Sequence, residues 1–189
     1  VAVSPGLIAV GAPNHDDGGT DVGAVYVFML DTSEGWIAQK LLPFEGGGPP
    51  PRSNFGYSVA TSDRDGGTVV VGAPCDDCSH RNGSVYVFVF QENSGLFFMI
   101  DVLRSVDRMT KSDSFGNSVA LSCNTIIVGA RYEDIGEKEY YYKFKHDTGS
   151  VYIFTHLEQG WVQTHKIVPT DMAVGASFGY QVAISTHTV

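Results

Sequence analysis

Residues 55–60 read Phe-Gly-Tyr-Ser-Val-Ala, and this stretch decides the fold because the chain repeats it. The pattern returns as Phe-Gly-Asn-Ser-Val-Ala at 115–120 and as Phe-Gly-Tyr-Gln-Val-Ala at 178–183. Self-similarity at such a spacing is the signature of a repeat architecture, in which every unit folds in the same way. We expect the glycine of each pair to give the backbone freedom for a sharp entry into the first strand of a unit.

Three further landmarks recur in constant order. The first is an apolar run ending in Gly-Ala-Pro at 8–13 and 69–74, which returns at 126–131 with Arg131 in place of the proline. A Gly-x-Val-Tyr run and then a glycine before another apolar strand complete the unit. Each unit thus holds four short apolar strands bounded by turn residues, which is typical of a β-propeller blade. The expected blades span 1–42, 55–103 and 115–168, with 178–189 as the first strand of a further blade.

In combination these residues resemble the FG-GAP repeat family, which includes the propellers of integrin α-subunits. The resemblance covers nearly the whole chain. It implies a propeller, which in this family usually has about seven blades, so we expect the chain to be one segment of a longer protein. It also implies an extracellular or cell-surface module for adhesion or assembly, not an enzyme, whose partners are other proteins or copies of itself.

The composition favours an all-β protein. The chain has 189 residues, of which 43% are hydrophobic and 17% charged, with 22 glycines. Glycine together with many Val, Tyr and Phe residues favours short strands and tight turns. The net charge of −9 disfavours nucleic acid and anionic membrane surfaces, which are bound through lysine and arginine. No apolar run reaches the roughly 20 residues that span a bilayer.

Two groups of carboxylates are candidate calcium ligands. Integrin-like members of the family carry an acidic loop between the first and second strands, and only the second unit keeps part of it, as Asp63 and Asp65. The loop between the second and third strands is acidic in every unit. Its candidate ligands are Asp16, Asp17, Asp21, Asp76 and Asp77. The alternative is that these aspartates form their own turns, and both interpretations stay open.

Cys75 and Cys78 lie in the same loop of the second unit. A Cys-x-x-Cys pair can be a redox motif, half a zinc site or a local disulfide. A redox motif needs a helix N-terminus, which is not expected here, and zinc needs two more ligands at suitable spacings. We therefore expect a disulfide, which agrees with an oxidising compartment. Asn82 begins an Asn-Gly-Ser triplet and is a candidate glycosylation site.

The third unit has an insertion between its second and third strands. The insertion holds Tyr140, Tyr141, Tyr142, Lys143 and Lys145, an aromatic and basic run in an acidic protein. Because loops on rigid scaffolds carry function and tyrosine is favoured at contact surfaces, this run is the candidate partner-contact element. The alternative is that it extends the hairpin and packs on its own blade.

Two other functions are weighed against a protein-binding module. A glycan-binding lectin would need Trp36, Trp161 or the tyrosine-rich run as exposed stacking platforms, whereas we expect both tryptophans to cover blade edges in fourth strands. A propeller hydrolase or lyase would need a catalytic residue. Ser177 matches a Gly-x-Ser-x-Gly pattern, but it takes the place of Asn54 and Ser114 in the repeat, which explains it without catalysis.

Overall fold

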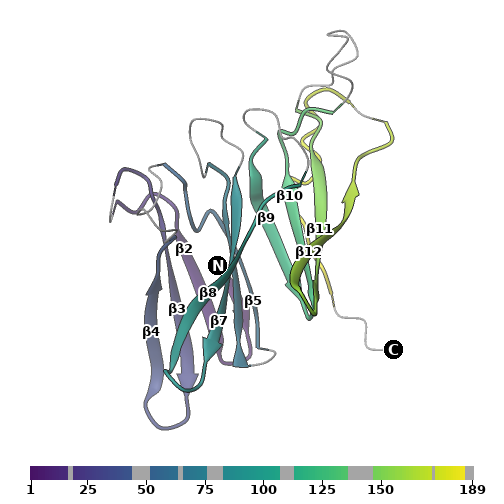
Figure 1. Cartoon of the computed structure of the whole chain (residues 1–189). Helices are drawn as coiled ribbons and strands as arrows, with labels where there is room; N and C mark the ends of the chain where they lie inside the picture. Colours follow the sequence, from purple (N-terminus) through teal and green to yellow (C-terminus); the bar gives the residue numbers. More distant parts are fainter. Residues whose placement is uncertain are drawn as a thin grey trace.

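The computed structural model is an all-β protein made of three separate sheets that lie side by side (Figure 1). It describes residues 1–16, 19–43, 52–63, 66–75, 83–106, 113–135, 147–171 and 173–185. Within these ranges no helix is long and apolar enough to cross a membrane. Each sheet has four antiparallel strands in chain order, which confirms the prediction of propeller blades. The three sheets do not close into a ring.

The strands of each sheet are consecutive in the sequence. The first sheet consists of β1 (Ala2–Ser4), β2 (Leu7–Ala12), β3 (Ala24–Asp31) and β4 (Gly35–Leu41). The second consists of β5 (Ser58–Ser62), β6 (Thr68–Ala73), β7 (Ser84–Gln91) and β8 (Leu96–Leu103). The third consists of β9 (Phe115–Ser122), β10 (Thr125–Ala130), β11 (Ser150–Leu157) and β12 (Gly160–Ile167). We call these sheets the first, second and third blades.

The core lies in the two interfaces between blades. Strand β7 carries apolar side chains on both faces of the sheet, because one face packs on the first blade and the other on the third. Tyr86 and Phe88 face the first blade, whereas Val85 and Val87 face the third. The phenylalanines of the first two Phe-Gly pairs pack edge-on against the tyrosine of the third strand, at 5.2 Å between the ring centroids of Phe55 and Tyr86 and 5.3 Å between those of Phe115 and Tyr152. The repeated landmarks are therefore contact residues of these interfaces.

Pairs of glycines let neighbouring blades approach closely. A Cβ atom at Gly11 would overlap the carbonyl oxygen of Gly56 in the second blade, and one at Gly72 would overlap that of Gly116 in the third. Gly56 and Gly116 have φ of +90° and +88°, which favours glycine and confirms the expected sharp entry. The glycine of Gly-Ala and the glycine of the next Phe-Gly pair thus form one contact. Only residues without a Cβ can make it.

Hydrogen bonds strengthen the same junctions. Ser58 Oγ donates to the carbonyl of Gly116 over 2.8 Å, and Ser118 Oγ donates to that of Gly179 over 2.8 Å. The Phe178 amide donates to the carbonyl of Thr148 in the third blade, as the Phe55 amide donates to that of Val22 in the first. The structure assigns no strand to 179–185. A strand needs a paired neighbour, so the expected first strand of a further blade stays a prediction.

Candidate functional site

The chain order of the strands sorts the connections into two edges of the molecule. In an antiparallel sheet ordered β1-β2-β3-β4, the first-to-second and third-to-fourth hairpins share one edge, and the second-to-third loop lies at the other. The links from each fourth strand to the next blade start at that other edge as well. We call it the loop edge; its described residues between second and third strands are 13–16, 19–23, 74–75, 83, 131–135 and 147–149. Of the predicted site residues that the structure describes, Asp16, Asp21 and Cys75 belong to it and Asp63 does not.

Two described aspartates of the loop edge bind the backbone of their own loops. Asp16 Oδ1 accepts a hydrogen bond of 2.9 Å from the Asp21 amide, and Asp134 Oδ1 accepts one of 2.9 Å from the Asp147 amide. Asp21 and Asp147 both have φ of +52°, a conformation that aspartate tolerates in turns. The equivalent bonds in two blades support turn formation as the role of Asp16.

The calcium prediction is not settled by these bonds. Asp17, Asp65, Asp76 and Asp77 lie outside the described residues. Asp63 follows β5 at the opposite edge, far along the strands from Asp16 and Asp21. Among the described residues no group of three or more His, Cys, Asp or Glu side chains could hold a metal ion. Calcium therefore stays a prediction for the loops as a whole.

The other sequence candidates are placed only in part. Cys75 lies two residues after the end of β6, whereas Cys78, Asn82 and the insertion residues Tyr140, Tyr141, Tyr142, Lys143 and Lys145 lie outside the described residues. The disulfide, the glycosylation site and the contact element therefore stay predictions. Trp36 and Trp161 lie in β4 and β12, the fourth strands where they were expected.

The backbone supports the repeat interpretation of Ser177. Ser177 has φ of +53°, and Asn54 and Ser114 have +53° and +54°. In all three units the carbonyl of this residue accepts a hydrogen bond from the amide three residues later, which belongs to Tyr57, Asn117 or Tyr180. Ser177 thus repeats a turn conformation of the other units.

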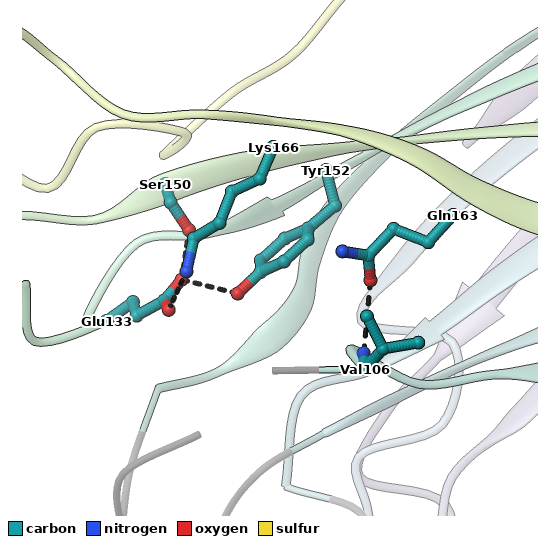
Figure 2. Close-up of polar contacts among 6 residues, drawn as sticks. All are labelled: Val106, Glu133, Ser150, Tyr152, Gln163 and Lys166. Atoms are coloured by element: carbon teal, nitrogen blue, oxygen red, sulfur yellow. Dashed lines mark hydrogen bonds and ion pairs between the residues drawn. The ribbon is translucent and has the colours of Figure 1, made fainter. Parts of the chain in front are cut away.

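A buried carboxylate, Glu133, organises the root of the insertion (Figure 2). Its side chain is 5% exposed. Oε1 accepts a bond of 2.6 Å from Lys166 Nζ on β12, and Oε2 accepts bonds from the hydroxyls of Tyr152, at 2.8 Å, and Ser150 on β11. Three segments therefore converge on one charge. A buried carboxylate is stable when it is paired and hydrogen-bonded in this way.

The first blade holds different chemistry at the same place. The amide of Gly23 bonds to the carbonyl of His15 as that of Gly149 bonds to Glu133. His15 Nε2 lies 3.2 Å from Lys40 Nζ, and Lys40 stands opposite Tyr26 in the sheet, as Lys166 stands opposite Tyr152. In the sequence, Glu133 is one acid of the acidic loop between the second and third strands and has no motif of its own. The sequence signal for this cluster is a lysine in the fourth strand of two units, Lys40 and Lys166, each opposite the tyrosine of the Gly-x-Val-Tyr run.

The hydroxyl of Tyr152 gives this cluster a defined pH dependence. Burial, and next the negative charge of Glu133, raise the pKa of Tyr152 above its ordinary value of 10.0. The folded protein therefore keeps this proton after the unfolded chain loses it. The contribution of Tyr152 to stability is complete below pH 10 and decreases as the pH rises further.

Tyr152→Phe is therefore expected to cost about 1 kcal/mol of unfolding free energy at pH 8, through the lost hydrogen bond. The difference in unfolding free energy between variant and parent should become smaller at pH 10.5, because only the parent loses stability through Tyr152. Urea unfolding at both pH values measures it. Tyr57→Phe, at an exposed tyrosine, controls for alkali acting elsewhere. A gap that stays constant would show that Tyr152 is not held protonated.

Comparison with known proteins agrees with this architecture. The sequence model of the FG-GAP repeat matches residues 49–88, 109–154 and 161–189. The chain belongs to the FG-GAP repeat family. The first two matches begin before the Phe-Gly pairs at 55 and 115 and end in the third strands, so an FG-GAP unit here starts with the pair that contacts the preceding blade. No curated protein matches the chain.

Proposed function

We propose that this FG-GAP chain is an extracellular protein-interaction or scaffold module that contacts its partner through the loop edge. The observation that carries the proposal is the fixed root of the insertion. The Gly149 amide donates to the carbonyl of Glu133 over 3.0 Å, and the Asp147 amide donates to Asp134 Oδ1. Both ends of the insertion are thereby tied together.

The buried contacts beneath the root support this function. Glu133 binds side chains of β11 and β12, so the loop begins on a charge-paired base in the body of the blade. A loop whose ends are held by a rigid scaffold loses less backbone entropy on binding than a segment with a free end. The side chains carried by this loop include three tyrosines and two lysines, and tyrosine is enriched at protein interfaces.

Site-specific photo-crosslinking tests this proposal. A photoreactive amino acid at Tyr141 of the full-length protein, in cells that naturally make it, is expected to capture a protein partner or a second copy. Protease added to intact cells should remove the crosslinked species, because the proposal places it outside the cell. The matched control is Glu92, an exposed residue in the β7–β8 hairpin at the opposite edge. Equal capture from both positions, or capture from Glu92 alone, would contradict the proposal.

One observation favours the lectin alternative. Trp36 is 52% exposed and stands opposite Leu30, which is 51% exposed, so the first blade presents an apolar pair next to its third-to-fourth hairpin. Exposed tryptophan can stack on a sugar ring. Binding to a glycan array that is lost in Trp36→Ala, or when Tyr140, Tyr141 and Tyr142 are replaced, would favour a lectin over a protein-binding module.

A further inference from the structure

Arg131 is the residue at which the third blade departs from the other two. It follows Gly129-Ala130 at the end of β10, where the first and second units have Pro13 and Pro74. Proline offers neither charge nor an amide donor, whereas Arg131 offers both. Its backbone amide donates to Asn117 Oδ1 over 3.0 Å. The departure therefore adds a cation at a position that the structure fixes.

The surrounding residues hold Arg131 in place. The buried Asn117 side chain, besides accepting from Arg131, donates to the carbonyl of Tyr180 over 3.0 Å. The guanidinium carbon lies 4.4 Å from the ring centroid of Tyr132 and 5.0 Å from that of Tyr180. Two aromatic rings and one amide thus define the position of the cation before any ligand arrives.

The hydrogen-bonding capacity of the guanidinium is not used by the described residues. None of their carboxylates pairs with Arg131, and its Nε atom is buried without an acceptor. Arg131 lines two cavities, one of about 260 Å³ and one of about 650 Å³, and Tyr57 and Asn117 line both with it. A planar donor group with unused N–H groups beside an open cavity is suited to a carboxylate, which it can bind through two parallel hydrogen bonds.

Asn117 helps to create this space. It occupies the position held by Tyr57 in the second blade and Tyr180 in the next unit, so the third blade has a small amide between two tyrosines. Tyr57, Tyr132 and Tyr180 are 47%, 36% and 57% exposed. Aromatic side chains around an arginine are the typical composition of energetically dominant contacts between proteins.

We infer that Arg131, with Tyr57, Tyr132 and Tyr180 around it, binds the carboxylate of an aspartate or glutamate side chain in a protein partner. The net charge of −9 opposes polyanions such as nucleic acid, whose binding requires many cations. A single carboxylate in a peptide needs one cation and gains from the adjacent rings. This inference rests on the proposed function and gives the chemistry of the partner.

The test uses the full-length protein and two small probes, N-acetyl-aspartate N-methylamide and its asparagine counterpart. Titration followed by NMR of the arginine Nε–H signals is expected to show saturable binding of the aspartate probe alone. Arg131→Gln should weaken that binding at least about tenfold, since the charge-assisted bonds are lost. Arg131→Lys should weaken it less, because it keeps the charge without the planar fork. Arg104→Gln removes an exposed arginine that lines neither cavity and should leave binding unchanged.

The outcomes separate this inference from the proposed function. Equal binding of both probes, or binding unaffected by Arg131→Gln in a variant with the parent melting temperature, overturns the carboxylate site. If crosslinking from Tyr141 then still captures a partner, the proposed function stands without it. If the probe binds as expected and no partner is captured at the loop edge, the site is real and the proposed function is wrong.

Discussion

Gly72→Ala is expected to lower the free energy of unfolding by about 3 kcal/mol or more, although it adds a single methyl group. The added Cβ would overlap both the carbonyl oxygen of Gly116 and the hydroxyl of Ser58. Neither can move freely, because Ser58 Oγ donates to that same carbonyl over 2.8 Å. The second and third blades would have to separate, which exposes part of the apolar interface between them. Thermal and urea unfolding of the full-length protein measure the loss.

Gly95→Ala is the matched control for this prediction. Gly95 has φ of +69° in the β7–β8 hairpin, with no atom within 4 Å of an added Cβ. Its replacement is expected to cost about 1 kcal/mol through backbone strain alone. Gly72 has no such strain, so the pair separates crowding from conformation. If Gly72→Ala costs no more than Gly95→Ala, the blades do not pack through glycine contacts.

Lys166→Met is expected to cost about 3 kcal/mol, because it leaves the buried carboxylate of Glu133 without its countercharge. Methionine can replace the apolar stem of the lysine, which is itself 25% exposed, so lost packing contributes little. The remaining partners, Ser150 and Tyr152, are neutral donors. Urea unfolding at pH 7 measures the change.

A double-mutant cycle identifies the cause of that loss. Glu133→Gln removes the charge but keeps an acceptor for Ser150 and Tyr152. The double variant Glu133→Gln/Lys166→Met is expected to be more stable than Lys166→Met alone, since no unpaired charge is buried in it. The coupling free energy should be about 1–2 kcal/mol. Strictly additive effects would mean that Glu133 and Lys166 do not interact in solution.

The sequence allowed the blades to be predicted because each landmark has a local physical cause. Gly56 and Gly116 need a left-handed backbone, and the run from Val85 to Phe88 needs cover on both faces. Both requirements leave a mark within a few residues, and repetition makes the mark visible. The family match confirmed what these patterns predicted.

The polar sites could not be predicted in the same way. The cluster around Glu133 takes its members from a loop, from β11 and from β12, and no spacing in the sequence links Glu133 with Lys166. Arg131 was visible only as a departure from Gly-Ala-Pro, and its tyrosines, Tyr57, Tyr132 and Tyr180, come from three units. Such groups are brought together by strand pairing and blade packing, which a local pattern does not encode. For Asp16 the sequence left two roles open, calcium ligand and turn former. The hydrogen bond that Asp16 accepts from the Asp21 amide favours the turn.

The bonds that join neighbouring blades also determine the order in which the protein can be built. Ser58 reaches Gly116 across 58 positions of the chain, and Ser118 reaches Gly179 across 61. Both of these junctions therefore form between segments that leave the ribosome one after the other, and the earlier blade is available as a template when the later one emerges. Assembly of this row of blades can advance from the N-terminal side during translation, and neither of its two junctions has to wait for a distant part of the chain.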